Sequence, residues 1–431
     1  MRRLLFLIAL SHSALSMADD LLSLYQRAVV SAPALNGSEY ALAIARAEED
    51  QALGRLLPKA EISGNYSLNR LTYQNRPASE YAGIRAGLNV VQPLFDLQSY
   101  LLMKSQEART SQGEEELLAA HQQLIYDLVE RYVNALEAAD NSEIIAAELA
   151  ATEQQLKRVT AMHARQLALI TDLYELQARV ATLRTQLLDS DNQARISLEK
   201  LRELTGDAVS HLQAARLDVP QIPPEGSIES WVQQAGQNPE LLALRHAVEA
   251  ARRSITAYRA GHLPRIELQI GGNYSDTSFN NQQSLPYDVG SASVQATLPL
   301  YEGGMTEAKV RAAQAQRGLS AARLEQKRRE LEQLTRAAYL DMAASPARNQ
   351  ATDRQLQASE KSRDAMKKGY ELGVVTIVDL LAAEQQLSAA RKSQRLARYR
   401  YFKARSALYR QAGRLLADEL VQLNNGLLNT H

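Results

Sequence analysis

The sequence predicts a mainly α-helical chain that also supplies four β-strands to a transmembrane β-barrel, and three observations support this fold class. The chain is duplicated, because three prolines and a tyrosine recur at one spacing of 299 − 93 = 206 residues. Residues 60–95 and 265–299 alternate apolar and polar side chains, as strands with one apolar face do. Residues 97–206 and 303–413 have the three- and four-residue apolar spacing of coiled-coil helices. We therefore expect two copies of one unit, each a β-hairpin followed by a long α-helical coiled-coil hairpin.

The duplication can be followed at individual positions. The matched residues are Pro33 and Pro239, Pro58 and Pro264, Tyr81 and Tyr287, and Pro93 and Pro299. The tripeptide Asn-Tyr-Ser recurs at a spacing of 273 − 65 = 208, so the second copy holds two additional residues at that point. Four matches at one spacing indicate a tandem repeat rather than coincidence.

The first eighteen residues have the features of a secretory signal peptide. Two arginines precede an apolar run, and the small-residue pattern Ser16-Met17-Ala18 follows it. A short buried helix is the alternative interpretation of this segment. Removal of residues 1–18 would leave 431 − 18 = 413 residues, and two repeats of 206 residues fill that length.

Composition excludes several classes of protein. The chain contains no cysteine, so we expect no disulfide framework, thiolate metal site, cysteine nucleophile or lipid attached to cysteine. No later apolar run reaches eighteen residues, so no transmembrane helix is expected. The formal net charge is +0 and no basic stretch is present, which argues against a nucleic-acid partner.

The first repeat is expected to span residues 19–213. Asp19 and Asp20 can cap a first helix, and Pro33 begins a second helix that should end near Leu57, before Pro58. The β-hairpin is expected at 60–95 and the helical hairpin at 97–206. The helical hairpin should reverse around Gln166 to Thr171.

The second repeat is expected to span residues 231–420 after a proline-rich connector at 214–230. Its predicted parts are a helix at 239–262, a β-hairpin at 265–299 and a helical hairpin at 303–413 that reverses at Gly369 to Thr376. Residues 421–431 are expected to form a C-terminal tail.

The four predicted strands imply an oligomer. Each is about ten residues long and alternates apolar and polar side chains, which is the length and pattern of transmembrane β-strands. A soluble amphipathic sheet packed on helices is the alternative. Because about eight strands are needed to close a membrane barrel and open edges are not tolerated in lipid, four strands per chain require association. A trimer would supply about twelve strands.

The sequence resembles the TolC-type outer-membrane channel family, also called outer membrane efflux proteins. The residues that carry the resemblance are the QPLF and LPLY strand-to-helix junctions, LLPKAEISGNYS and HLPRIELQIGGNYS before each hairpin, and GYELGVVTIVDLLAAEQQL at the second helical reversal. The resemblance implies a homotrimer with a 12-stranded β-barrel in the outer membrane and an α-helical barrel across the periplasm. It also implies the function of exit duct for a tripartite efflux pump or a type I secretion system. The implied partners are a periplasmic adaptor (membrane fusion) protein, an inner-membrane transporter of the RND or ABC type, and outer-membrane lipid.

The resemblance also suggests pore and gating residues. Gly373 and Asp379 match a glycine and an aspartate at the periplasmic tip of the second helical hairpin, and Asp172 matches the aspartate of the first tip. Tyr370 matches an aromatic residue that, in the family, helps to link neighbouring tip helices.

This sequence departs from the family pattern at three tip positions. Gln166 stands where a glycine is usual, Val375 where some members have a gating arginine, and Ala382 where some have a second acidic residue. These differences concern gating and leave the channel interpretation in place.

Asp379 has two interpretations. Three copies around a threefold axis would form a carboxylate ring that favours cations, and the resemblance favours this interpretation. Alternatively, Asp379 is a helix N-cap just after the reversal. Asp172 has the same alternatives, and we expect it to face a neighbouring helix rather than the lumen.

No catalytic or cofactor site is expected. The seven histidines show no paired metal spacing, and the EGGM sequence at 302–305 lacks the lysine and spacing of a phosphate loop. No nucleophile elbow is present. Two functions from different classes remain: a passive transport conduit, and a structural envelope-spanning coiled-coil protein that does not conduct. The alternating strands favour the conduit, since a structural rod would not need four membrane-length strands.

Overall fold

The computed structural model describes residues 19–72, 74–75, 77–209, 212–214, 220–277 and 285–427. The predicted signal peptide at 1–18 lies outside these residues. The chain divides into two compact units. We call Met1–Gly37, Ala119–Asn238 and Glu330–His431 the tip unit, and Ser38–Leu118 and Pro239–Arg329 the sheet unit. None of the helices in the described ranges is both long and apolar enough to cross a membrane.

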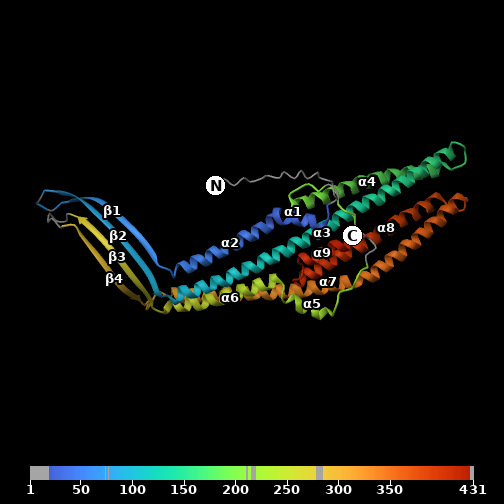
Figure 1. Cartoon of the computed structure of the whole chain (residues 1–431). Helices are drawn as coiled ribbons and strands as arrows, with labels where there is room; N and C mark the ends of the chain where they lie inside the picture. The colour runs from blue at the N-terminus through green and yellow to red at the C-terminus, as the bar shows by residue number, and fades with distance from the viewer. Residues whose placement is uncertain are drawn as a thin grey trace, which may run out of the picture. The chain divides into compact units, whose positions relative to one another are not determined.

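The order of elements repeats along the chain (Figure 1). The first copy consists of α1 (Leu21–Ser31), α2 (Pro33–Gly54), β1 (Lys59–Leu71), β2 (Ser79–Phe95), α3 (Leu97–His163) and α4 (Ile170–Thr205). The second copy consists of α5 (Ile228–Ala235), α6 (Pro239–Arg259), the 3-10 turn η1 (Ala260–His262), β3 (Arg265–Thr277), β4 (Tyr287–Thr297), α7 (Met305–Glu371) and α8 (Ile377–Gln411). A further helix, α9 (Ala417–Leu427), follows the second copy.

The two copies match closely in length. Helices α3 and α7 each contain 67 residues, and α7 begins 305 − 97 = 208 residues after α3. Helices α4 and α8 contain 36 and 35 residues. Strands β1 and β3 each contain 13 residues and are offset by 265 − 59 = 206. The predicted duplication of a β-hairpin and a long helical hairpin is therefore confirmed.

Some predicted boundaries were wrong. Helix α2 ends at Gly54 instead of Leu57, because the chain turns before β1 and the Leu56 N–H bonds to the Leu53 carbonyl at 2.9 Å. The predicted 239–262 helix changes to a 3-10 turn after Arg259. Strand β4 ends at Thr297, just before the proline at 299 that lacks a donor for the ladder.

Two segments predicted as irregular contain helices. Helix α5 begins inside the predicted connector 214–230, because Ser227 caps it and Trp231 is buried. Helix α9 replaces most of the predicted tail at 421–431. Its Leu420, Leu423 and Leu427 have no exposed surface and join the main core of the tip unit, so apolar burial holds this segment in place.

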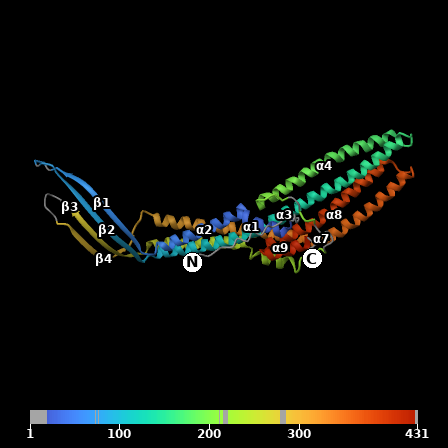
Figure 2. The same ribbon diagram turned by 45° about the horizontal axis from the view of Figure 1, so that its top comes forward.

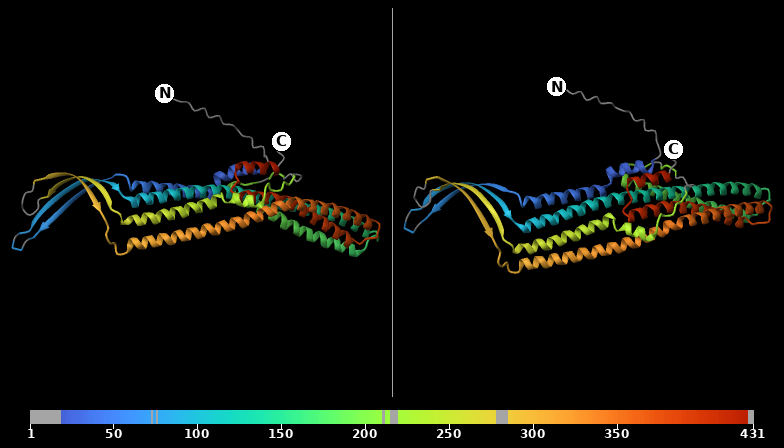
Figure 3. Two further views of the ribbon diagram at one scale, coloured as in Figure 1. Left: turned by 90° about the horizontal axis from the view of Figure 1, so that it is seen from below. Right: turned by 60° about the horizontal axis from the view of Figure 1, so that its bottom comes forward.

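The four strands form one antiparallel sheet in the order β1-β2-β3-β4 (Figure 3). Directly opposed residues share a face, and the pairings Ile62 with Leu88 and Leu88 with Gly272 join even-numbered residues throughout. Leu268 likewise opposes Val294. Outside the register shift between Pro93 and Phe95, the even-numbered residues of the four strands therefore lie on one face, which carries most of the aliphatic side chains, and the mainly polar odd-numbered residues lie on the other. The outer edges of the described sheet are β1 and β4.

The tip unit contains two helical hairpins, formed by the part of α3 from Ala119 on with α4 and by the part of α7 from Glu330 on with α8 (Figure 2). Its main core includes Leu24 of α1, Tyr132 of α3, Leu201 of α4 and Leu408 of α8, each fully buried. The Tyr132 hydroxyl donates to the Gln213 carbonyl at 3.1 Å, so the buried phenol is satisfied. Burial raises the pKa of Tyr132 well above its ordinary value.

Candidate functional site

The two helical reversals have the same backbone geometry. Gln166 and Gly373 occupy equivalent positions, since 373 − 166 = 207, and both have left-handed backbones with φ of 61° and 77°. In each case the next residue closes the turn: the Leu167 N–H bonds to Met162 O and the Val374 N–H to Gly369 O, both at 2.9 Å. The predicted departure at Gln166 thus falls where glycine is conformationally favoured.

Gly369 allows the second reversal to close tightly. A Cβ built at this position would lie 2.6 Å from Val375 Cγ2, which is closer than carbon atoms can approach. Val375 is half-buried against this glycine, and Ala382 is exposed on α8. Neither residue brings a charge to the tip.

Asp379 takes part in a capping box at the start of α8. Thr376 is the N-cap, and its hydroxyl accepts from the Asp379 N–H at 3.2 Å. The Asp379 carboxylate accepts from the Thr376 hydroxyl at 2.6 Å and from the Thr376 N–H at 3.3 Å. The alternative interpretation of Asp379 as the N-cap itself was therefore wrong by three positions, since Thr376 takes that place. Asp379 remains exposed.

Asp172 lies in the first turn of α4, whose N-cap is Leu169 and has no side-chain cap. The Tyr370 hydroxyl donates to Asp172 Oδ2 at 3.3 Å, so the structure brings together two residues that are 198 positions apart in the sequence. Burial and the neighbouring Asp172 carboxylate both raise the pKa of Tyr370. This contact joins the second helical hairpin to the first.

A small apolar cluster surrounds this contact. Val159 of α3, Leu176 of α4, and Ile377 and Leu380 of α8 are buried together, and Met366 and Tyr370 of α7 pack against them. Packing and the Tyr370 hydrogen bond therefore act at the same place.

A second link between the hairpins lies farther along α3. Asp140 Oδ2 accepts from Arg395 Nη1 and from the Tyr399 hydroxyl of α8, both at 2.9 Å. Burial first, and Asp140 second, raise the pKa of Tyr399. Sequence reasoning missed this site because one aspartate and one arginine 255 residues apart in a helical chain carry no recognisable spacing.

The ends of the hairpins expose apolar side chains. Leu167, Leu169, Leu372 and Val374 are between 68 % and 78 % exposed. Two of these residues flank Gly373 and two follow Gln166. Exposed apolar residues gathered on short reversals are typical of an interaction surface.

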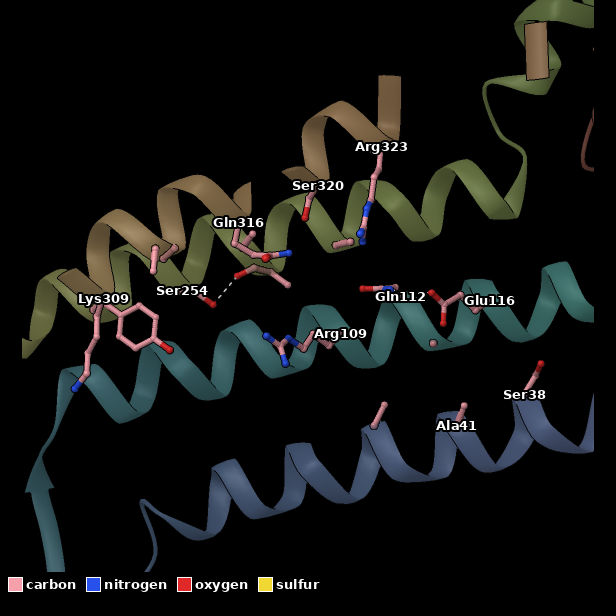
Figure 4. A pocket seen from close by; sticks show the side chains of 18 residues that line it. Ser38, Ala41, Arg109, Gln112, Glu116, Ser254, Lys309, Gln316, Ser320 and Arg323 are labelled. Carbon is pink, nitrogen blue, oxygen red and sulfur yellow. Dashed lines mark hydrogen bonds between the residues drawn. The ribbon is translucent and has the colours of Figure 1, made fainter. Parts of the chain in front are cut away.

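The sheet unit contains a separate cavity of about 710 Å³ between α2, α3, α6 and α7 (Figure 4). Small side chains line much of it, including Ala45, Ala250 and Ala313. Arg109 of α3 and Arg323 of α7 extend into this region, and neither pairs with a carboxylate in the part of the chain that the structure describes. The lining supplies no nucleophile with an adjacent base. Within the described ranges no group of histidines and acidic residues could hold a metal ion.

Comparisons with known proteins agree with this architecture. A family model described as outer membrane efflux protein matches residues 24–207 and again 231–414. The two matches are offset by 231 − 24 = 207 residues, which agrees within one residue with the spacings of 206 and 208 found in the sequence and the fold.

Two characterised relatives and one solved structure illustrate the similarity. The outer membrane protein TolC of Escherichia coli (strain K12) is 28% identical over 442 residues, covering 99% of this chain and 90% of that protein. The alkaline protease secretion protein AprF of Pseudomonas aeruginosa is 30% identical over 352 residues, covering 80% of this chain and 73% of that protein. A crystal structure of CusC matches with a TM-score of 0.82 at 20% identity and covers 92% of each chain, which shows the shared fold.

Proposed function

Since the chain belongs to the outer membrane efflux protein family, we propose that it forms a trimeric outer-membrane channel, the exit duct of a tripartite efflux pump or a type I secretion system. Transport through this duct is passive and includes no catalytic step. The chain is an outer-membrane protein, and in our proposal its long helices extend into the periplasm.

The observation that carries the proposal is the four-stranded sheet. One face carries most of its aliphatic side chains, among them Leu88, Leu268 and Val294, and the opposite face carries polar residues such as Asn65, Asn89, Asn273 and Gln295. An apolar outer face and a polar inner face are required of a strand between lipid and a water-filled lumen. The outer edges of β1 and β4 carry unpaired backbone groups that lipid cannot satisfy. Three protomers, joined edge to edge, would close a barrel of twelve strands and leave no edge.

The tips support a partner at the periplasmic end. Leu167, Leu169, Leu372 and Val374 expose apolar surface on the two reversals of each protomer. A periplasmic adaptor protein with apolar side chains at its own tip would cover this surface and connect the duct to an inner-membrane transporter.

We propose that Tyr370 and Asp172 help to hold the tips closed, and that Asp379 contributes to a cation-attracting ring at the pore mouth. The support for the first role is the 3.3 Å hydrogen bond between the hairpins, and for the second the exposure of the Asp379 carboxylate. Gly373 and Gln166 supply the reversals on which these residues stand.

Purification in detergent followed by planar-bilayer recording tests this function. We expect light scattering to give the mass of a trimer and the bilayer to show discrete conductance steps. A stable monomer would contradict the barrel, and a trimer without conductance would favour a structural envelope-spanning protein.

A further inference from the structure

The polar face of the sheet carries one charged residue near its centre. Arg85 of β2 lies opposite Asn65, the central residue of β1, and opposite Ser275 of β3. On the polar face of the described strands, the other charged side chains lie in the first three residues of β1 and β3. They are Lys59, Glu61, Arg265 and Glu267. The nearest of them along the strands is Glu61, and one row of uncharged residues on this face, Ser63, Gly87 and Asn273, separates it from Arg85.

A cavity of about 550 Å³ opens beside Arg85 on the same face. Besides Arg85, its lining includes Ser63, Asn65, Asn273, Ser275 and Tyr287, all of which can donate hydrogen bonds, and no carboxylate lines it. In the described part of the chain, Arg85 has no ion-pair partner. The guanidinium and its neighbours therefore offer donors and a positive charge without an acidic counterpart.

Gly87 maintains this cavity. A Cβ at this position would lie 2.6 Å from Asn273 Oδ1 and 3.3 Å from Ser63 Oγ. Because Gly87 has no side chain, the side chains of Ser63 on β1 and Asn273 on β3 can both extend over β2 at this position, two residues from Arg85. A larger residue would push both polar groups away and fill the hollow.

We propose that Arg85 forms an anion-attracting site in the barrel lumen, which favours cargo that carries carboxylate, sulfate or phosphate groups. This inference rests on the proposed trimeric barrel, which places three copies of Arg85 around one axis. Rings of arginine or lysine select anions in pores, as rings of acids select cations.

The size of a twelve-stranded barrel makes such a ring effective. With strands about 4.8 Å apart and tilted by about 40°, the barrel radius is about 12 Å, so extended arginines reach to about 6 Å from the axis. At 0.1 M salt the Debye length is about 10 Å, and three such charges enrich chloride on the axis about sevenfold.

Reversal potentials under a KCl gradient test the proposal. We expect Arg85→Gln to increase the ratio of potassium to chloride permeability and Arg85→Glu to increase it further, whereas Arg85→Lys should leave it nearly unchanged. Arg70→Gln is the matched control, because Arg70 lies on the opposite, apolar face of β1 and pairs with Glu80 at 3.9 Å. A shift in Arg85→Gln no larger than that in Arg70→Gln would overturn the proposal.

A second experiment compares two reagents on a single variant, so differences in folding between variants do not affect its result. The chain has no cysteine, so Arg85→Cys provides a single thiol that can be modified in an open channel during recording. A positively charged thiosulfonate reagent should restore anion preference, and a negatively charged one should increase cation preference. Equal effects of both reagents would refute the proposed site. Absence of any conductance in the unsubstituted protein would instead refute the channel function.

Discussion

Replacement of Tyr370 by phenylalanine tests whether the hydrogen bond to Asp172 holds the tips closed. The change removes only the hydroxyl that donates to Asp172 Oδ2 and leaves the aromatic ring in its cluster with Leu176 and Leu380. Hydrogen bonds to charged groups contribute about 1.5 to 3 kcal/mol, but this one is long at 3.3 Å and only half-buried, so we take about 1 kcal/mol per protomer.

That energy sets the expected effect on gating. If each protomer opens independently, the ratio of open to closed states rises about fivefold per protomer, and if three protomers open together it rises on the order of a hundredfold. Tyr370→Ala should raise it further, because it also removes the packing of the ring. The measurement is open probability in single-channel recordings of the purified protein in symmetric salt.

Two controls make this prediction specific. Tyr174→Phe removes an exposed hydroxyl from α4 nearby and should leave open probability unchanged. Asp172→Ala should reproduce the effect of Tyr370→Phe, and the double variant should add little to either single change. Unchanged open probability in Tyr370→Phe, or full additivity in the double variant, would refute the role of this contact.

The other predictions concern the strands, the reversals and the pore mouth. Val294→Arg on the apolar face should impair insertion into vesicles by about 2 to 4 kcal/mol near the bilayer midplane, while Gln295→Arg on the polar face should be tolerated. Equal tolerance of the two substitutions would mean that the faces are misassigned. Gly373→Ala should destabilise the second reversal by about 1 kcal/mol, and Gln166→Gly should stabilise the first by a smaller amount. Amide hydrogen exchange should then become faster at the second reversal in Gly373→Ala and slower at the first in Gln166→Gly. Asp379→Asn keeps an oxygen for the capping box and should lower cation preference without affecting assembly, so an unchanged reversal potential would leave this residue with the capping role alone.

The sequence predicted the repeat and its long elements because their signals extend over many residues. Alternation recurs at every pair of residues in the strands, and apolar spacing recurs at every helical turn of α3 and α7. Each signal is therefore repeated many times along its element. The reversal at Gly373 was predictable for the opposite reason, since a glycine between two helical segments permits the left-handed backbone that ends a helix.

The parts that the sequence did not predict depend on contacts between distant segments. Helix α9 is short, and the role of its Leu420 and Leu423 is visible only in the structure, where both are buried in the main core of the tip unit. Asp140 joins Tyr399 and Arg395 across 259 and 255 positions, which no local spacing reveals. Thr376 could have been recognised as the cap, because a threonine followed three residues later by an acid is a known helix start.

The duplication also determines how one protomer would meet the next. Inside the chain, β2 of the first copy pairs with β3 of the second, with Gln92 opposite Leu268. In the proposed trimer, β4 would meet β1 of the partner subunit, and these strands are the repeats of β2 and β3. Applying the offset of 206 to that pair gives 92 + 206 = 298 and 268 − 206 = 62, so Ile62 would lie opposite Leu298 of the partner subunit, the residue directly after the end of β4. Both numbers are even, so the apolar face would continue without interruption across the seam between subunits. Each intersubunit seam would thus be a copy of a junction that every chain already forms within itself.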